Sequence, residues 1–262
     1  MRNILFIMLI SLLWQAPAGA SDLAKEKRWH DQISDSLLSG ETCELKAGDT
    51  AFTGIYTEAE PGPTGRLVIL VHGIGVHPDW PDVIHPLRTG LPAHGWSTLS
   101  IQMPVLANDA PLKDYLPLFD EAGPRLKAAV DYAHQQGAKT VVIVAHSLGA
   151  SMAARYVADN PGGVNGLVII GMSVITLDDK MNGARALEKI TLPVLDLFGS
   201  RDLDAVLKSG DTRARAAHKA GNKDYRQLQI EGADHFFVGV EDELVRRTYG
   251  WLKSHYEKPT GK

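Results

Sequence analysis

The chain of 262 residues contains a single cysteine, Cys43, so it cannot form an intramolecular disulfide. No His/Cys cluster has the spacing of a zinc site, and no Gly-rich pattern typical of nucleotide phosphate binding is present. We expect Cys43 to be a buried or inert thiol, in preference to a catalytic or intermolecular one. The fold must therefore be stabilised by its core, and nothing in the sequence calls for a metal or an organic cofactor.

An excess of basic charge is also absent. Lysine and arginine total 27 against 31 aspartate and glutamate residues, which gives a formal net charge of -4. This mildly acidic balance argues against nucleic acid or an anionic membrane as the main partner. Hydrophobic residues make up 44% of the chain, which is typical of soluble globular proteins and sufficient for a sizeable core.

One apolar run lies near the start of the chain, from Ile4 to Trp14, and the basic residue Arg2 precedes it. It is too short to span a bilayer as a conventional helix, and the Ala18-Gly19-Ala20 that follows matches the small-x-small pattern of signal peptidase sites. We predict that residues 1–20 are an export signal. Residues 21–262 would then form a single domain with no stable membrane insertion; the alternative is an uncleaved membrane anchor.

The rest of the chain alternates between strand-like and helix-like patterns. It begins with a charged stretch, residues 21–46, that we expect to be a helical lead-in. Apolar runs typical of strands follow at 51–57, 66–71, 96–103, 140–144, 167–170, 193–198 and 225–230. Helices are expected at 83–94, 121–136, 150–159 and 241–256. This alternation predicts an α/β fold with a mostly parallel sheet covered on both faces, whose site lies at the carboxyl ends of the strands.

The segment Ala145-His146-Ser147-Leu148-Gly149 lies between the most apolar strand and a helix. A sharp turn there would hold Ser147 in a strained backbone conformation and raise its hydroxyl above the sheet edge. In the usual pattern one glycine lies two residues before the serine and another lies two residues after it. Here Ala145 replaces the first glycine and adds one methyl group. We therefore predict that Ser147 is a nucleophile, and that His146 packs against or orients the turn.

A serine hydroxyl needs a base to activate it, and the base needs an acceptor to hold its tautomer. His235 follows the last strand and is the candidate base, and Asp202 follows the preceding strand and its turn glycine. Asp204 remains an alternative acid, whereas Asp196 would point into or through the sheet. Asp234, beside the candidate base, is expected to stabilise its turn.

Acyl transfer also needs hydrogen-bond donors for the oxyanion that forms when the carbonyl is attacked. The backbone amide of Leu148 follows the nucleophile directly, and we expect the second donor to be the amide of Ile74. Gly73 and Gly75 would let that loop come close to the substrate. His72 is expected to be a structural hydrogen-bonding residue below the loop.

Four segments resemble, in chain order, the signature regions of the α/β-hydrolases: Val71–Gly75, Ala145–Ala150, Gly199–Asp202 and Gly232–Phe236. The resemblance extends from about residue 50 to residue 256 and implies an eight-stranded, mainly parallel sheet with an antiparallel edge strand. The block Val71–Trp80 together with Gln102-Met103-Pro104 is similar to exported bacterial hydrolase-like proteins of unknown function. That closer resemblance implies a Gram-negative periplasmic location but no substrate.

The function we predict is a serine hydrolase of esters, thioesters or amides, in which Ser147 attacks, His235 transfers the proton and Asp202 orients the imidazole. Only residues 176–191 are available for a lid, so we expect a minimal lid and an open cleft with little apolar surface for a long chain. A small-molecule or polymer-displayed acyl substrate fits that expectation. The alternatives are a non-catalytic protein of this fold that binds an envelope partner or glycan, and a haloperoxidase or lyase with the same triad.

Overall fold

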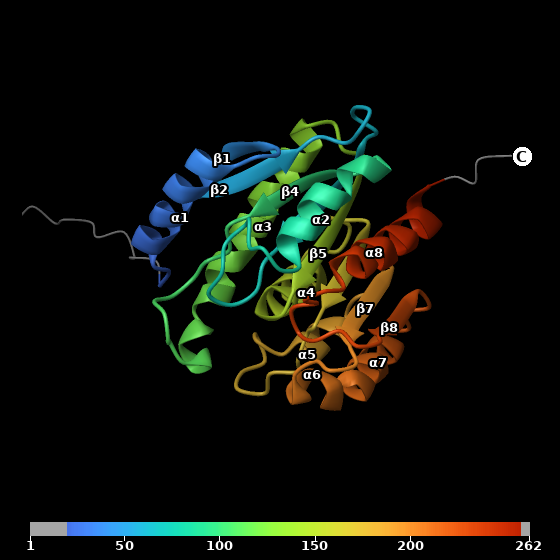
Figure 1. Cartoon of the computed structure of the whole chain (residues 1–262). Helices are drawn as coiled ribbons and strands as arrows, with labels where there is room; N and C mark the ends of the chain where they lie inside the picture. The colour runs from blue at the N-terminus through green and yellow to red at the C-terminus, as the bar shows by residue number, and fades with distance from the viewer. Residues whose placement is uncertain (1–19, 258–262) are drawn as a thin grey trace, which may run out of the picture.

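The computed structural model describes residues 20–257, so apart from Ala20 the predicted export signal lies outside the described residues. Its centre is an eight-stranded sheet with the order β1-β2-β4-β3-β5-β6-β7-β8 (Figure 1). The strands are β1 Glu41–Ala47, β2 Thr50–Thr57, β3 Arg66–Val71, β4 Ser97–Ile101, β5 Thr140–His146, β6 Gly166–Ile170, β7 Val194–Gly199 and β8 Tyr225–Ile230. The strands β4, β3, β5, β6, β7 and β8 run parallel to one another. At one edge β2 pairs antiparallel with β4, and β1 pairs antiparallel with β2. The expected mostly parallel eight-stranded sheet is confirmed.

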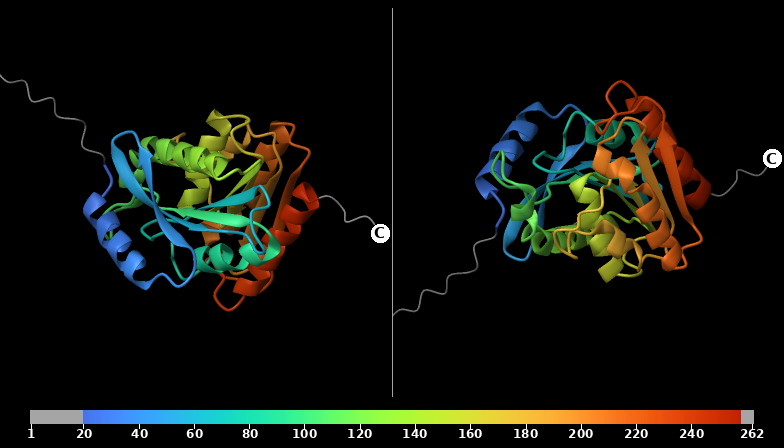
Figure 2. Two further views of the ribbon diagram at one scale, coloured as in Figure 1. Left: turned by 90° about the horizontal axis from the view of Figure 1, so that it is seen from above. Right: turned by 90° about the horizontal axis from the view of Figure 1, so that it is seen from below.

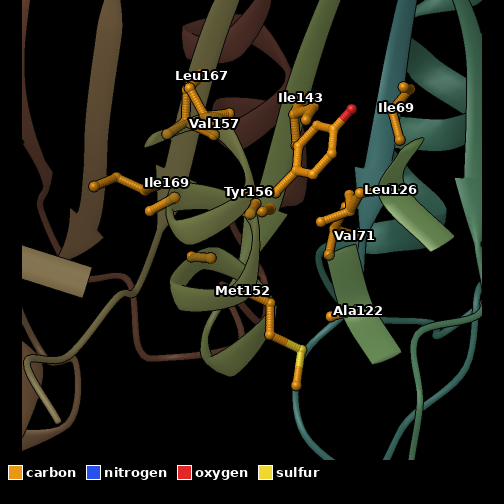
Figure 3. Close-up of a cluster of buried hydrophobic side chains, with 14 of the residues drawn as sticks. Ile69, Val71, Ala122, Leu126, Ile143, Met152, Tyr156, Val157, Leu167 and Ile169 are labelled. Carbon is orange, nitrogen blue, oxygen red and sulfur yellow. The ribbon is translucent and has the colours of Figure 1, made fainter. Parts of the chain in front are cut away.

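The central strands are apolar on both faces, because helices cover both sides of the sheet. On one face, Ile69, Val71 and Ile143 pack against side chains of α3 Leu118–Gln135 and α4 Leu148–Asp159 (Figure 3). The alternate residues of the same strands, such as Val68 and Val142, face a second cluster that includes residues of α2 Ile84–Gly90 and α8 Glu241–Tyr256. A strand buried on both faces gives a continuous aliphatic run, which is the pattern that the sequence shows.

The remaining helices complete these two layers. α5 Gly183–Leu187 contacts α4 on one side and α7 Gly210–Lys219 on the other, with the short α6 Asp204–Lys208 before α7. Two 3₁₀ helices, η1 Pro92–His94 and η2 Leu112–Tyr115, lie in the connections around β4. Figure 2 shows α1 Leu23–Ser36 and the β1–β2 hairpin at one end of the molecule, with β8 and α8 at the other. No helix within residues 20–257 is long and apolar enough to cross a membrane.

A buried ion pair fastens α1 to the rest of the fold. Arg125 of α3 donates from Nη1 to Glu26 Oε2 at 2.8 Å and from Nη2 to Glu26 Oε1 at 3.1 Å, and both side chains are buried. Arg125 also donates to the carbonyl oxygen of Gln102, just beyond β4. Burial raises the pKa of Glu26, although the neighbouring guanidinium opposes this shift.

Three segments differ from the sequence expectation. The lead-in 21–46 is not wholly helical, because after α1 it continues as β1, which pairs with β2 over its whole length. The expected helix 83–94 ends as an α-helix at Gly90, because Pro92 has no N–H to continue the hydrogen-bond ladder and the chain continues as η1. The helices α6 and α7 are additional to those that the sequence pattern predicts.

Candidate active site

Ser147 lies on a sharp turn between β5 and α4, with φ 54° and ψ -125°. A non-glycine residue with this backbone conformation is strained by about 1–3 kcal/mol, and such strain is concentrated at functional sites. The turn also packs tightly, since a Cβ added at Gly149 would lie 2.1 Å from the carbonyl oxygen of His72. Ala145 is accommodated within β5, where it is fully buried and pairs with Val71 and Ile169.

The structure brings Ser147, His235 and Asp202 together from the ends of β5, β8 and β7. His235 Nε2 is 3.0 Å from Ser147 Oγ, and His235 Nδ1 is 2.6 Å from Asp202 Oδ1. His235 and Asp202 are both buried, whereas Ser147 is partly exposed. The geometry is that of a nucleophile, a base and an acid in one hydrogen-bonded row.

The other candidate acids occupy different places. Asp204 is exposed and pairs with Lys208 in the next turn of α6, away from His235. Asp196 is fully buried in β7, where Arg213 donates to its carboxylate at 2.7 Å. Asp234 accepts the backbone N–H groups that follow it at residues 236 and 238, which is the turn-stabilising role expected for it.

The carboxylate of Asp202 is surrounded by hydrogen-bond donors. Besides His235, the backbone amide of Leu203 donates to Oδ1 at 2.7 Å and that of Gly199 donates to Oδ2 at 3.3 Å. Burial acts to raise the pKa of Asp202, but the hydrogen bond and charge of His235 and these two amides lower it below its ordinary value. An ionised Asp202 accepts a hydrogen bond from Nδ1–H of His235, which leaves Nε2 unprotonated and able to accept a hydrogen bond from Ser147.

His146 hydrogen-bonds to the backbone of His235. Its Nε2 lies 3.0 Å from the carbonyl oxygen of His235, and the two rings are 4.8 Å apart between centroids. Because a carbonyl oxygen can only accept, Nε2 of His146 carries the proton. Burial, reinforced by the neighbouring His235, lowers the pKa of His146 to about 4, so the ring is neutral at pH 7. This agrees with the orienting role expected for His146.

The loop after β3, which contains Ile74, is held by His72. The ring donates from Nδ1 to the carbonyl oxygen of Gly73 at 2.8 Å, and its Nε2 accepts the backbone N–H of Met103 at 2.9 Å. Burial lowers the pKa of His72 to about 3, which keeps this neutral tautomer. A Cβ at Gly73 would lie 3.1 Å from Ser147 Cβ, so the loop passes close to the nucleophile turn.

The two amides expected to bind an oxyanion are those of Leu148, the residue after Ser147, and Ile74, the residue after Gly73. Leu148 is the first residue of α4, and Ile74 lies in the loop that passes the nucleophile turn. Within residues 20–257, neither amide donates to a backbone carbonyl. An N–H at the first position of a helix has no partner inside the helix and is free to bind an anionic oxygen.

The connection between β6 and β7 forms no large lid, and exposed apolar side chains lie in the connections at the strand ends. Between β6 and β7 the chain forms only the five-residue α5, as a minimal lid requires. Cavities of about 420, 180, 320 and 210 Å³ are present elsewhere, and Ser147, Asp202 and His235 line none of these four. Six large apolar side chains in the connections at the carboxyl ends of the parallel strands are well exposed: Ile74, Leu112, Leu177, Leu203, Phe236 and Val238. Their positions in loops carry no periodic signal that sequence reasoning could use.

Cys43 lies far along the sheet from this site, on the edge strand β1. It is half-buried in the wall of the 420 Å³ cavity, between α1 and the β1–β2 hairpin. Burial raises the pKa of its thiol, which makes it a poorer nucleophile at neutral pH. Within residues 20–257 no group of three or more His, Cys, Asp or Glu side chains could hold a metal ion.

The sheet order, the strained serine turn and the position of the site at the strand ends define an α/β-hydrolase fold. The chain belongs to the family described as "Protein of unknown function (DUF3530)", whose model matches residues 14–117 and 119–254. No curated protein sequence matches the chain.

Solved structures with the same fold include several enzymes. Est1E from Butyrivibrio proteoclasticus is 16% identical, with a TM-score of 0.64 over 82% of this chain and 98% of that one. A dienelactone hydrolase from Anabaena variabilis is 20% identical, with a TM-score of 0.64 over 82% and 97% of the two chains. The esterase Est2 from Thermogutta terrifontis is 14% identical, with a TM-score of 0.68 over 86% and 96%. At these identities the likeness establishes the fold.

Proposed function

We propose that the protein is a serine hydrolase that cleaves a carboxylic ester, or a related thioester or amide, with a small or polymer-displayed acyl group. The observation that carries this proposal is the continuous row of Ser147 Oγ, His235 and Asp202, with separations of 3.0 and 2.6 Å. The strained backbone of Ser147 adds to it, because the fold maintains that strain at the serine that hydrogen-bonds to His235.

In the proposed mechanism, Ser147 Oγ attacks the carbonyl carbon while His235 Nε2 takes the hydroxyl proton. The negative charge that develops on the carbonyl oxygen is stabilised by the amides of Leu148 and Ile74. When the bond to the leaving group breaks, the imidazolium gives its proton to the leaving oxygen, sulfur or nitrogen. Water then attacks the acyl-enzyme with His235 as base again, which releases the acid and restores the Ser147 hydroxyl.

Two further observations support an active enzyme over a non-catalytic binder. The mechanism needs the tautomer of His235 that carries its proton on Nδ1, and the hydrogen bond to Asp202 favours that tautomer. His146 hydrogen-bonds to the backbone carbonyl oxygen of His235 and so holds that residue in place. In addition, the similar structures are named as esterases and as dienelactone hydrolases. A protein that only bound a glycan or a partner would need none of this arrangement.

A fluorophosphonate probe tests the proposal, because it reacts with an activated serine and leaves ordinary serines unmodified. We expect one covalent adduct, at Ser147, and its loss in Ser147→Ala and in His235→Ala. Ser151→Ala is the matched control on the same helix, since its hydroxyl is buried and hydrogen-bonds to no other described group. If the folded wild-type protein formed no adduct at Ser147, the proposal would be wrong.

We also propose that the chain is exported to the periplasm and cleaved after Ala20, and that no nucleic acid or stable membrane insertion is involved. The support is the sequence of residues 1–20 and the acidic net charge of -4. N-terminal sequencing of protein from a periplasmic extract should begin at Ser21. Recovery of the full-length chain in the membrane fraction would show the alternative, an uncleaved anchor.

A further inference from the structure

The buried ion pair between α1 and α3 is connected by hydrogen bonds to the loop after β3. Arg125 Nη1 donates to the carbonyl oxygen of Gln102 at 3.0 Å. The N–H of the same peptide group belongs to Met103, and it donates to His72 Nε2 at 2.9 Å. One peptide group therefore joins the guanidinium of Arg125 to the imidazole of His72.

A second peptide group continues from the other side of the imidazole. His72 Nδ1 donates to the carbonyl oxygen of Gly73 at 2.8 Å. The N–H of that peptide group is the amide of Ile74, the proposed oxyanion donor, which donates to no backbone carbonyl within residues 20–257. We call this series the oxyanion relay: Arg125, the Gln102–Met103 peptide, His72 and the Gly73–Ile74 peptide.

The geometry of a peptide group passes orientation along the relay. A planar trans peptide points its carbonyl oxygen and its N–H in opposite directions, and both peptide groups of the relay are trans. A donor that fixes the oxygen of such a group therefore also fixes the direction of its N–H. Each link donates toward the next, and hydrogen bonds in a row polarise one another. The relay thus both aims the Ile74 N–H and strengthens it as a donor.

The relay is shielded from water. The side chains of Arg125, Gln102 and His72 are buried, each at 1% exposure. Burial lowers the pKa of His72 to about 3, so the ring is neutral and its Nε2 stays an acceptor. Water cannot readily replace a link in such surroundings, and each link therefore has one geometry.

Glu26 fixes the first member of the relay. Its carboxylate accepts from Arg125 Nη1 at 2.8 Å and from Nη2 at 3.1 Å. Two parallel hydrogen bonds hold the plane of a guanidinium, so Nη1 keeps its direction toward Gln102. An ion pair that only joined α1 to α3 would not need this additional contact with the backbone just beyond β4.

We propose that Arg125, held by Glu26, is a positioning residue of the hydrolase, which acts through the relay to aim the Ile74 N–H at the oxyanion. This inference rests on the proposed function, since it concerns the oxyanion formed when Ser147 attacks. Removal of one whole oxyanion donor lowers kcat by about 10²–10³-fold. A donor that is present but less well aimed should lose part of that effect, about tenfold.

Removal of the ion pair tests the proposal. In the double variant Glu26→Leu with Arg125→Met no buried charge is left unpaired, so the chain should fold. With p-nitrophenyl acetate we expect kcat to fall about tenfold and KM to stay near the wild-type value, because the oxyanion exists only after attack. An unchanged kcat, or a change confined to KM, would overturn the proposal.

Lys25→Met is the matched control. Lys25 neighbours Glu26 on α1, is also buried, and donates from Nζ to the carbonyl oxygen of Leu106 and to the side chain of Asn108. It therefore makes the same kind of contact just beyond the relay without belonging to it. We expect wild-type kcat in this variant. An equal fall in kcat in Lys25→Met and in the double variant would mean that the docking of α1 is the cause, and would overturn the proposal.

A break within the relay tests whether the effect passes through His72. His72→Phe removes both hydrogen bonds of the ring, and we expect it to lower kcat about tenfold or more. Loss of the ion pair should then cause no further fall in kcat, because its connection to Ile74 is already cut. The same factor of loss in both backgrounds would overturn the relay. If His72→Phe does not fold, the comparison of the ion-pair variant with Lys25→Met still decides.

The His235–Asp202 pair provides a separate readout. The proton between these groups, whose nitrogen and oxygen are 2.6 Å apart, should give a downfield proton NMR signal. The ion-pair variant should keep this signal at its wild-type position, because neither residue belongs to the relay. Loss of the signal would assign the low kcat to a damaged triad and would overturn the proposal.

The inference and the proposed function fail in different ways. Folded wild type without a fluorophosphonate adduct at Ser147 contradicts the proposed function. If Ser147 is labelled but the acetate turns over too slowly to measure, the rate of labelling replaces kcat, since the phosphonyl oxygen also gains negative charge as the serine attacks. Equal labelling rates in wild type and in the ion-pair variant would then overturn the role of Arg125 and leave the proposed function intact.

Discussion

Ser147, Asp202 and His235 reach one another from the ends of three different strands. In the proposed mechanism each is effective only in the presence of the other two. Removing either Ser147 or His235 should therefore abolish most of the turnover that removing both would abolish. We expect Ser147→Ala and His235→Ala each to lower turnover by about 10⁴-fold or more, and the double variant to be little worse than either. Steady-state kinetics on any ester that wild type hydrolyses measures this. Multiplicative losses in the double variant would show that the residues act independently.

Two buried neutral histidines make stability depend on pH. Burial lowers the pKa of His72 to about 3 and that of His146 to about 4, against about 6.5 for histidine in an unfolded chain. Between those values the unfolded chain binds more protons than the folded one, so the free energy of unfolding decreases as pH falls below about 6.5. We expect a loss of about 2 kcal/mol from each histidine between pH 7 and pH 4.5, measured by urea unfolding across that range.

A single substitution separates this effect from general acid denaturation. In His72→Gln the amide can still donate to Gly73 and accept from Met103, but it does not titrate. The variant should be less stable than wild type at pH 7 and should show a shallower decrease toward pH 4.5. A parallel decrease in both proteins would mean that His72 is already charged in the folded state or contributes nothing.

At the residue level the sequence predicted that Ser147, Asp202 and His235 would lie together, because chemistry-bearing residues followed strand patterns in a fixed order. The exposed apolar residues in the connections at the strand ends were not predicted, since exposure in a loop depends on how neighbouring loops pack. Arg213, the partner of Asp196, was also missed. It lies on α7, and no pattern within the strand shows which helical side chain will reach a buried carboxylate.

At the scale of elements, Arg213 connects segments on both sides of the loop that carries Asp202. Its Nη1 donates to the carbonyl oxygens of Met172 and Val206, and its Nε donates to Asp196. Arg213 and Asp196 are both fully buried. Arg213→Met leaves the carboxylate without its countercharge, so we expect a destabilisation of about 3–5 kcal/mol in urea unfolding.

A double variant tests whether the unpaired buried charge causes the loss of stability in Arg213→Met. In the double variant Asp196→Leu with Arg213→Met both charges are absent, and we expect it to be more stable than Arg213→Met alone. Lys208→Met removes the exposed pair with Asp204 and should change stability by less than about 1 kcal/mol. A double variant as unstable as the single one would assign the loss to packing.

The elements themselves were predictable where one pattern persisted for several turns or along a buried strand. α8 has the bounds expected from its helical pattern, and β3 and β8 have those expected from their apolar runs. The β1 strand was not recognised, because it is an edge strand with only one of its seven residues buried and a mixed polar composition. Its pairing with β2 depends on a contact across the hairpin, which local periodicity does not encode.

At the scale of the whole molecule, the start of the described chain is fixed to the first turn of α3, about a hundred residues further along. The backbone N–H groups of Ala20 and Ser21 donate to Glu121 Oε1 at 2.5 and 3.2 Å, and Ser21 Oγ donates to Oε2 at 2.7 Å. Cleavage after Ala20 would replace the Ser21 amide with an ammonium group beside this carboxylate. Export processing would thus create an ion pair that the uncleaved chain does not have.

A chain that begins at Ser21 should therefore be more stable than one that keeps Ala18-Gly19-Ala20 before it. We expect a difference of about 0.5–1 kcal/mol, since both groups are partly exposed. Pairing raises the pKa of the α-amino group above its usual value of about 7.7–8.0, so the difference is fully present below about pH 7.7 and is lost as pH rises through the raised value. Urea unfolding of both chains at about pH 6.5 and pH 10 measures it, and Glu121→Gln should abolish it. Equal stability of the two chains at the lower pH would show that the new α-amino group forms no stabilising ion pair with Glu121.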